Sequence, residues 1–386
     1  MGKKEYILIR NFAVLFIMGI LLDWFFPFRG IVWKVAFVLL SLYVGLFKEK
    51  GKLPCEKAVL VFAFFNLLHF FISFLRVTPH ISVIGGILFA LLSLSLFTCL
   101  SQKGVMTEEF FRIIVIIFLI AAVLHFNHSR LMRIEKLGAS EDSDVTVNAS
   151  VVFLMMLPML FFINNKIQKW SVLLVCIYFI VLSAKRGNIL ASIIPILLFI
   201  RMELKDSKHS FAKTLLVIIA IIGVSIITYN WMTNNFYLMH RIEVTQEGDS
   251  NGRDIIYRNC WNAWVNSDNV FTYLFGYGFD GTIKHPQIHK YAHNDWLEIL
   301  VDYGLLGIFL YLLVFFSFFV QIHRLSDYKS KVILASSVFI WFMKTLYSMG
   351  YTEHFLSITM ICIGTVLGQY KNSENKDLNL IQDKEN

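Results

Sequence analysis

The chain has 386 residues, of which 57% are hydrophobic, 16% are aromatic and only 16% are charged, with a formal net charge of +8 at pH 7. This share of apolar residues exceeds what the core of a water-soluble domain requires. The composition therefore excludes a soluble enzyme and predicts a polytopic membrane protein. The apolar segments show no strand-like alternation, so the fold class that we expect is all-α rather than a β-barrel.

We predict about twelve transmembrane helices, because apolar segments able to cross a bilayer core of about 30 Å follow one another along almost the whole chain. The approximate spans are 7–26, 30–47, 57–76, 80–100, 108–126, 147–163, 168–184, 187–201, 211–231, 294–320, 331–348 and 353–370. The first is too long for a signal-peptide core, so we expect it to be retained. The eighth is short and contains Pro195.

The basic residues predict which side of the membrane each loop faces. With both termini inside, more than half of the 35 Lys and Arg residues fall in inner loops, as the positive-inside rule requires. The expected organisation is nine spans over 1–231, an outer loop with short helices over 232–292, three spans over 293–370 and a disordered inner tail over 371–386. The net positive charge is mainly a topology signal and gives no reason to expect nucleic acid as a partner.

Lys185 and Arg186 lie between the seventh and eighth predicted spans, on the side where positive charge is disfavoured. One interpretation is a pair of long side chains that extend from a helix end to the membrane surface. The other is an anion clamp, since an Arg side chain stays ionised and holds a diphosphate through two parallel hydrogen bonds. We expect Lys185 to be the residue that merely extends to the surface.

The outer loop contains a signal for an amphipathic helix after the Asn251-Gly252 turn. Ile256, Cys260 and Trp264 recur on one face of this predicted helix. Arg253 stands at its start, where it could add its charge to the free backbone amides of a helix N-terminus at an anion site. The alternative is an ordinary surface Arg beside Asp254.

Gly276 and Gly278 follow in the segment "YLFGYGFDG" and predict a tight loop. This loop is not a nucleotide-binding P-loop, because the Gly-Lys-Ser/Thr sequence of that motif is missing.

The tenth predicted span begins with the polar stretch "YAHNDWLEILVDYGLLG". His293 stands before the helix, as a general base or as a simple surface residue, and Asn294 or Asp295 is expected to cap it. Three carboxylates share one helix face and must avoid lipid by facing a cavity or the membrane interface: Asp295, Glu298 and Asp302. Gly304 and Gly307 leave room for a neighbouring helix.

Two patterns in the sequence resemble metal sites, and neither favours a bound metal. His285, His289 and His293 recur every four residues, but Pro286 and the missing HExxH carboxylate speak against a zinc site. Asp142 and Asp144 form a DxD pattern inside an acidic, Ser-containing loop, where such a pattern is more often ordinary solvated sequence. We therefore expect no metal.

The order of these motifs resembles the O-antigen ligase/polymerase family of membrane glycosyltransferases. The shared features are Arg186-Gly187 at a span junction, Gly252-Arg253 with Trp261 downstream, Gly276-x-Gly278, His293-Asn294 before Leu297-Glu298, and Gly304-x-x-Gly307. The resemblance covers about 183–310 at the level of motifs. The ordered set, with a long outer loop between spans nine and ten, is far more specific than any single motif.

Two signatures of the ligase branch have counterparts in this chain. Its Arg-x3-Leu signature is matched by Arg186 and Leu190. Its His-Asn-x9-Gly-x-x-Gly signature is matched by the residues His293, Asn294, Gly304 and Gly307. The Thr expected after the last Gly is Ile308 here, which weakens the ligase assignment relative to the polymerase one, although the ligase branch stays slightly favoured.

The resemblance implies a GT-C-like fold in the bacterial inner membrane, with cytoplasmic termini and a periplasmic active site. The donor would be a glycan on undecaprenyl diphosphate, and the acceptor a lipid A–core sugar or a growing glycan. His293 would be the general base. Arg186 and Arg253, with Arg76 by analogy, would bind the diphosphate in place of a metal, and no cofactor is expected. Supporting positions would be Asn294, Glu298, Gly304 and Gly307.

Three functions remain open from the sequence. They are ligation of O-antigen onto lipid A–core, polymerisation of repeat units on the same carrier, and transport of a lipid-linked glycan or an ion without chemistry. A transporter is expected to have inverted repeats and broken helices near the middle of the membrane. The polar residues here gather at the outer surface, which favours the two enzymes over the transporter.

Overall fold

The computed structural model describes residues 2–25, 31–49, 56–76, 81–137, 147–183, 185–205, 252–267, 269–348, 350 and 355–385. The ninth predicted span, 211–231, lies outside these residues, as do Asp142 and Asp144. Within the described ranges every regular element is helical and none is a strand.

The helices follow the predicted spans closely over most of the chain. They are α1 Lys3–Leu21, α2 Ile31–Leu42, α3 Lys57–Arg76, α4 Ile81–Gln102, α5 Glu108–Leu137, α6 Val151–Met156, α7 Lys166–Leu182, α8 Arg186–Lys205, α11 Arg253–Val265, α12 Val270–Phe275, α13 Gly281–Lys284, α14 Asp295–Arg324, α15 Tyr328–Tyr347 and α16 Leu356–Glu385. Shorter elements are η1 Asp23–Phe25, η2 Tyr43–Lys48, η3 Asn148–Ser150 and η4 Leu157–Phe162.

Five of the described helical segments are long and apolar enough to cross a membrane. They are Ile31–Lys48, Lys57–Leu75, Glu108–Lys136, Arg186–Leu204 and Asp295–Arg324, the last with a break inside it at Gly304. Their outward side chains are apolar, as Phe64 of α3 and Phe316 of α14 illustrate with exposed fractions of 59% and 62%. Such rings need lipid around them, so the prediction of an all-α membrane protein is confirmed. The count of twelve spans stays a prediction.

The sixth predicted span is one apolar helical segment, Asn148–Phe162. It runs without interruption through η3, α6 and η4, with Pro158 near the start of η4. All residues of α6 and η4 are buried. Because other helices surround this segment on all sides, it is hydrophobic throughout.

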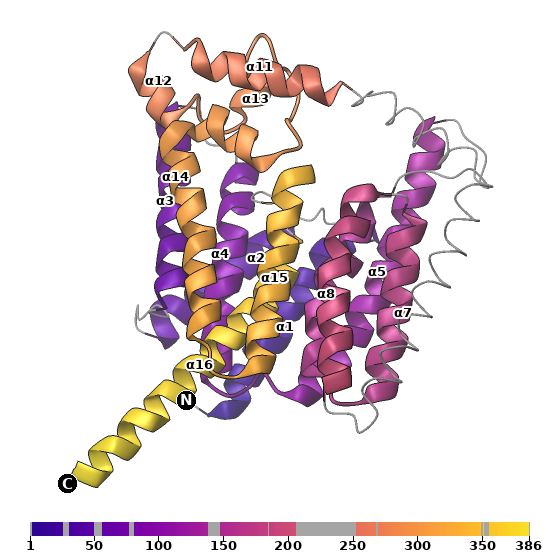
Figure 1. Cartoon of the computed structure of the whole chain (residues 1–386), viewed down its shortest axis with the longest axis vertical. Helices are drawn as coiled ribbons and strands as arrows, with labels where there is room; N and C mark the ends of the chain where they lie inside the picture. The colour runs from indigo at the N-terminus through magenta and orange to yellow at the C-terminus, as the bar shows by residue number, and fades with distance from the viewer. Residues whose placement is uncertain are drawn as a thin grey trace.

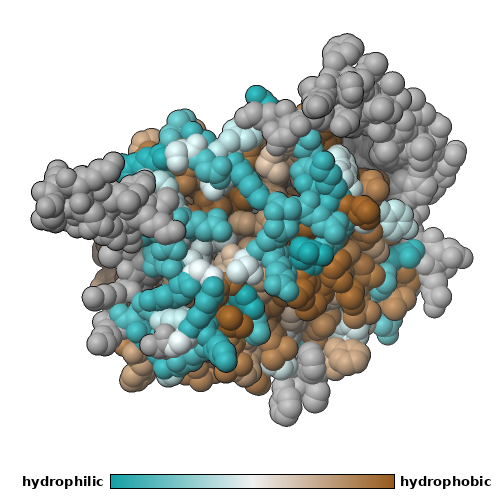
Figure 2. All heavy atoms as spheres, turned by 90° about the horizontal axis from the view of Figure 1, so that it is seen from below, coloured by the Kyte–Doolittle hydropathy of each residue, from teal (hydrophilic) through white to brown (hydrophobic). Residues whose placement is uncertain are grey.

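Figure 1 shows the long helices standing side by side as a bundle, with α11, α12 and α13 gathered at one end of it. We call this the loop end. The N-terminus and the end of α16 lie toward the opposite end, which we call the terminal end. Figure 2 views the terminal end and shows hydrophilic side chains across it, with hydrophobic side chains around the flank. This distribution fits a bundle whose flank meets lipid and whose end meets water.

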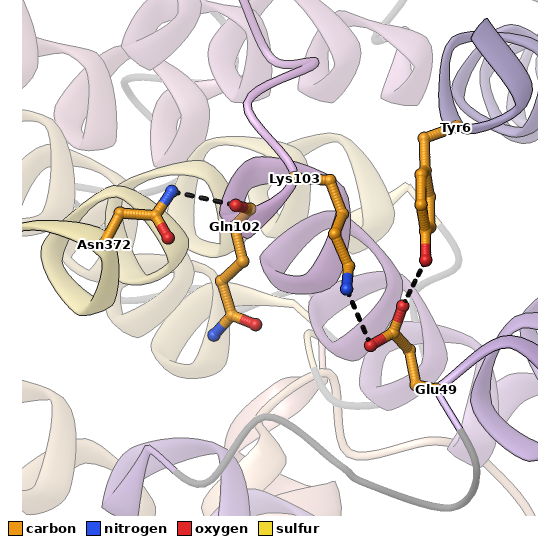
Figure 3. A network of polar contacts seen from close by, with 5 residues as sticks. All are labelled: Tyr6, Glu49, Gln102, Lys103 and Asn372. Atoms are coloured by element: carbon orange, nitrogen blue, oxygen red, sulfur yellow. Dashed lines mark hydrogen bonds and ion pairs between the residues drawn. The ribbon is translucent and has the colours of Figure 1, made fainter. Parts of the chain in front are cut away.

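A polar network at the terminal end ties the first and last helices together (Figure 3). Tyr6 of α1 donates a hydrogen bond of 2.6 Å to Glu49, which also forms an ion pair of 3.0 Å with Lys103 after α4. Asn372 of α16 donates to the backbone oxygen of Gln102 over 3.0 Å. The network connects segments that lie far apart in the sequence.

The helix α16 runs from Leu356 beyond the twelfth predicted span to Glu385. Its apolar half packs closely on α4. A Cβ atom added to Gly364 would lie 2.9 Å from the backbone nitrogen of Thr98, and one added to Gly368 would lie 2.5 Å from the Cβ of Ser101. Small residues thus allow the two backbones to approach, as is common between membrane helices.

Candidate active site at the loop end

The helix α14 is broken at Gly304, where the backbone has φ 64° and ψ −159°. Asp295 nevertheless accepts a hydrogen bond of 2.9 Å from the hydroxyl of Tyr311, sixteen residues further on. In a straight helix these residues would stand about 24 Å apart along the axis. Residues 295–303 therefore fold back over the end of α15, and the prediction of one continuous span over 294–320 is wrong.

The break is stabilised by the glycine loop that precedes α13. The amides of Tyr277 and Gly278 donate to the carbonyl oxygens of Val301 and Asp302 over 2.9 and 2.8 Å. These carbonyls lie within one helical turn of the break and gain partners from the loop. We call the Gly276 loop, together with residues 295–304 of the broken helix, the joint.

Glycine is required on both sides of this joint. Gly276 has φ 72°, and a Cβ atom there would collide with the backbone of Asp302 and Tyr303. A Cβ atom on Gly304 would lie 2.5 Å from the carbonyl group of Leu274 in α12. The expectation that Gly304 leaves room for a neighbouring helix is therefore confirmed.

The sequence predicts that Gly307 also leaves room for a neighbouring helix, but the residues around it are different. A Cβ atom on it would lie 2.5 Å from the Cβ of Tyr303 and 3.0 Å from a methyl group of Ile299. Both residues belong to the folded-back part of α14 itself. Gly307 therefore makes space for the two parts of one broken helix, which a sequence interpreted as a straight helix could not indicate.

The three carboxylates of the folded-back segment are buried and bind backbone and hydroxyl groups. Asp295 accepts from the amide of Gly350 over 2.7 Å, in addition to Tyr311. Glu298 accepts from the hydroxyl of Thr282 and from the amide of Ala292, the latter over 2.6 Å.

Asp302 completes this set, since it accepts from the amide of Thr282 over 3.3 Å. Each of the three carboxylates is at most 1% exposed. The predicted stripe thus faces neither a cavity nor the membrane interface. Glu298 and Asp302 fasten the segment before α14 onto the broken helix, and Asp295 fastens the helix to Gly350.

Asn294 caps the folded-back segment, which decides between the two predicted caps. Its side-chain oxygen accepts from the amides of Trp296 and Leu297 over 3.0 and 3.2 Å. Its side-chain nitrogen donates over 3.3 Å to the carbonyl of Leu346, at the end of α15. The cap therefore both starts a helix and docks it on α15.

His293 is exposed at the loop end in an unusual backbone conformation, with φ 53°. The left-handed region is costly for a residue with a side chain and persists only where the surroundings impose it. Here the amide of Ala292 on one side is bound by Glu298, and Asn294 on the other side is the helix cap. These contacts fix the position from which the imidazole projects.

Arg253 lies at the same end of the molecule, at the start of α11. It is the first residue of α11, whose buried face contains Cys260, Ala263 and Trp264, as the predicted amphipathic pattern requires. Figure 1 shows α11 lying across the loop end, with α12 at one end of it and its Arg253 end toward α8. The Arg253 side chain is half-buried.

Lys185 and Arg186 form the turn between α7 and α8. Gly187 lies against Tyr347, whose Cβ would be 3.0 Å from a Cβ on the glycine. Tyr347 adjoins Leu346, which accepts the hydrogen bond from Asn294. The start of α8 and the start of α14 therefore meet at the end of α15, and Arg186 is exposed there as the first residue of α8.

The pKa of His293 is lowered from its usual value of 6.5 by partial burial, then by the positive charge of Arg253 and then by that of Lys185. The imidazole is therefore neutral near pH 7, with a nitrogen free to accept a proton. Lys185 is half-buried, and its ammonium donates a hydrogen bond of 2.9 Å to Asn148. That Lys185 only extends to the membrane surface stays a prediction.

The histidine pattern that the sequence analysis compared with a zinc site does not form a helix face. The helix α13 ends at Lys284, so His285, His289 and His293 lie in turns and do not share a helix face. The ring of His285 instead packs edge-on against Tyr277, with 5.1 Å between the ring centroids. In the described part of the chain no group of three or more His, Cys, Asp or Glu side chains is placed to hold a metal ion.

Arg76 is the last residue of α3, and its side chain lies outside the described residues. Ser73, one turn earlier, is within 3.2 Å of the hydroxyl of Tyr303. The end of α3 therefore lies beside the break in α14. Binding of the diphosphate by Arg76 stays a prediction.

Residues 171–312 match the family described as O-antigen ligase. The matched segment contains Lys185, Arg186, Arg253 and His293 together with the glycines of the joint. No curated protein matches the chain. The family resemblance inferred from the ordered motifs is confirmed, over a segment that coincides with the motif-bearing part of the chain.

Proposed function

We propose that this chain, a member of the O-antigen ligase/polymerase family through its residues 171–312, is an O-antigen ligase. It would transfer a glycan from undecaprenyl diphosphate to a sugar of lipid A–core at the periplasmic face of the bacterial inner membrane. The observation that supports this most is the meeting of His293, Arg253 and Lys185 at the loop end, where the two cations lower the pKa of the imidazole.

The proposed reaction needs one base and a set of cations. The acceptor hydroxyl attacks the anomeric carbon of the donor sugar while the bond from that carbon to the diphosphate oxygen breaks. The hydroxyl proton passes to the neutral imidazole of His293, and the electron pair of the broken bond leaves with the diphosphate. Arg253 and Arg186 stabilise the charge that develops on the departing oxygen.

The alternative bases near His293 are already engaged. Glu298 accepts from Thr282 and Ala292, and Asp302 accepts from Thr282, all within the buried joint. A carboxylate that leaves these contacts would leave buried donors without partners, at a cost of about 1 to 3 kcal/mol each. This supports His293 as the base and assigns Glu298 a positioning role.

Cationic side chains remove the need for a metal ion in this proposal, because they supply the positive charge that a bound ion would add. We expect purified protein to keep its transferase activity in the presence of a chelator. Activity that disappears with the chelator and returns with magnesium or manganese would contradict this expectation. It would also make Asp142 and Asp144 candidate metal ligands.

Polymerisation of repeat units is the second candidate, because Ile308 stands where the ligase signature has Thr. Both enzymes would use the same donor and the same base, and they differ only in the acceptor. The lipopolysaccharide of a deletion strain separates them. A core without O-chain, with polymer accumulating on the lipid carrier, identifies a ligase. A core that carries a single repeat unit identifies a polymerase.

A further inference from the structure

The short helix α12 is held between the end of α11 and the break in α14. The ring of Trp264 in α11 stacks on that of Tyr273, with 4.3 Å between the ring centroids, and its indole nitrogen donates over 3.0 Å to the carbonyl of the same residue. On the other side, the carbonyl of Leu274 lies so close to Gly304 that a Cβ atom on the glycine would be 2.5 Å from it. The position of α12 relative to both helices is therefore fixed.

The outward face of α12 is apolar. Val270 is 75% exposed, and Phe271 and Leu274 are exposed beside it on the same face of the helix. The buried residue of α12 is instead Thr272, which carries a hydroxyl. A helix whose outward face meets water has the reverse distribution, with polar side chains outside and apolar side chains inside. The exposed face of α12 is thus suited to an apolar surrounding.

The exposed face of α11 changes from charged to apolar toward α12. Asp254, Arg258, Trp261 and Val265 follow one another on this face at helical spacing, the first two charged and the last two apolar. From position 261 to position 279 the sequence contains one charged residue, Asp268. We call the exposed apolar side chains at this end of α11 and on α12 the apolar patch; they are Trp261, Val265, Val270, Phe271 and Leu274.

The level of the apolar patch in the membrane follows from α14, against which α12 packs. The part of α14 after the break, from Leu305 to Arg324, has no charged residue before Arg324, and it is about 30 Å long, which equals the thickness of the hydrocarbon layer of a bilayer. Its exposed side chains form one apolar row, made of Leu305, Phe309, Leu312, Phe316 and Phe319. Gly304 therefore lies at the boundary of the hydrocarbon layer, and Leu274, which touches Gly304, lies at the same level.

We propose that the apolar patch inserts into the boundary between the headgroups and the acyl chains of the lipid leaflet at the loop end. Lipid is favoured over a second protein as its partner because the patch adjoins the lipid-facing row of α14 at Gly304. An indole ring combines an apolar body with a polar N–H group, so Trp261 suits this boundary. Such an anchor does not depend on the reaction proposed above.

The anchor holds one end of α11 in lipid and leaves the other end in water. Figure 1 shows α12 at one end of α11, and the Arg253 end of α11 directed toward α8. Asp254 and Arg258 are exposed on that second part of the helix. The membrane surface thus fixes the orientation of α11, and with it the direction from which Arg253 approaches the loop end.

Quenching of a fluorescent reporter locates the patch directly. The full chain is reconstituted in lipid nanodiscs with an environment-sensitive fluorescent amino acid at Val270, at Phe316 or at Arg258. Nitroxide groups on the lipids quench a reporter inside the membrane, and iodide quenches one in water. Phe316 is the control for the lipid-facing flank, and Arg258 is the control for water. Thermal unfolding of each variant checks that the fold is kept.

We expect iodide to quench the reporter at Val270 at least about threefold less than the one at Arg258, because the patch lies about 5 to 10 Å deep in the leaflet. A nitroxide close to the headgroups should quench Val270 best, whereas one near the acyl-chain end should quench Phe316 best. A Val270 reporter that iodide quenches as strongly as Arg258 lies in water and overturns the inference. A Val270 reporter protected from both quenchers also overturns it, and indicates a second copy of the chain as the partner.

A second measurement uses opposite expectations for water and for lipid. Val270 and Ile255 are exposed apolar residues in the first turns of α12 and α11, where an introduced carboxylate is favourable in water. In nanodiscs we expect Val270→Asp to lower the melting temperature by at least about 2 °C, because lipid disfavours the charge, and Ile255→Asp to leave it unchanged or raise it. A melting temperature that Val270→Asp leaves unchanged or raises, or that both variants lower equally, overturns the inference.

Discussion

At the scale of single residues, the geometry of His293 explains how an exposed side chain acquires a defined position. Its left-handed backbone, with φ 53°, costs on the order of 1 to 3 kcal/mol, and the contacts of Ala292 and Asn294 compensate for this cost. Nothing in the segment "YAHNDW" predicts a positive φ at His293. The ordered motifs around His293 identified it as a candidate site residue. No local pattern indicated the hydrogen bond between Lys185 and Asn148, which lies 37 residues earlier.

The pH dependence of transfer should report the charges around His293. The base must be neutral, so kcat/KM is expected to fall as the pH decreases through the lowered pKa and to level off above it. Positive neighbours disfavour the imidazolium, and removing one makes protonation easier. Arg253→Gln should therefore move the acidic limb of the profile to higher pH, and Lys185→Gln should do so by less, because its effect on the pKa is the smaller. A limb that stays in place, or moves to lower pH, contradicts this electrostatic account.

The two arginines should not tolerate conservative replacement. Lys keeps the charge but loses the planar fork that holds a phosphate through two hydrogen bonds. Losing a charge-assisted contact that acts in the transition state costs about 2 to 4 kcal/mol, or about 30-fold to 1000-fold in rate. We expect Arg253→Lys and Arg186→Lys to be clearly impaired in kcat/KM. Arg258→Ala is the control and should lose less than about tenfold, so equal losses at all three positions would speak against specific binding.

At the scale of elements, the break in α14 is the feature that builds the site. Hydropathy and helical periodicity identified the helix, its cap and the glycines, because each of these depends on local residue chemistry. They did not reveal the fold-back of residues 295–303, since a positive φ at Gly304 leaves the apolar pattern unchanged. The carboxylate stripe was misassigned for the same reason. In the broken helix Glu298 and Asp302 bind Thr282 in the segment before α14, and Asp295 binds Gly350 and Tyr311.

Gly304→Ala should damage the site through this joint. The substitution adds a Cβ atom 2.5 Å from the carbonyl of Leu274 in a conformation that disfavours side chains. We expect a loss of thermal stability equivalent to at least about 1 to 3 kcal/mol, with activity falling in parallel. Gly45→Ala is the matched control, since a Cβ there meets nothing within 4 Å. Equal melting temperatures for the two variants would show that the break is not tightly constrained.

At the scale of the whole molecule, the long apolar helices and the polar loop end were predictable because a bilayer imposes length and composition on every segment that crosses it. The terminal end is held by Tyr6, Glu49 and Lys103, contacts between distant segments that no local pattern contains. The same limit applies to the candidate site. Its residues stand at the start of α8, at the start of α11 and just before α14, and only the packing of α8 and α14 on the end of α15 and of α11 on α14 places them at the loop end.

The central claim is that this assembly transfers a glycan with His293 as its base. The most direct measurement is transfer from an undecaprenyl-diphosphate glycan to lipid A–core by wild type and His293→Ala, reconstituted in liposomes at equal abundance. Because His293 is exposed and its side chain contributes little to packing, we predict that the variant inserts and melts like wild type while transfer falls at least about 100-fold. Transfer at the wild-type rate by well-folded His293→Ala would contradict the account.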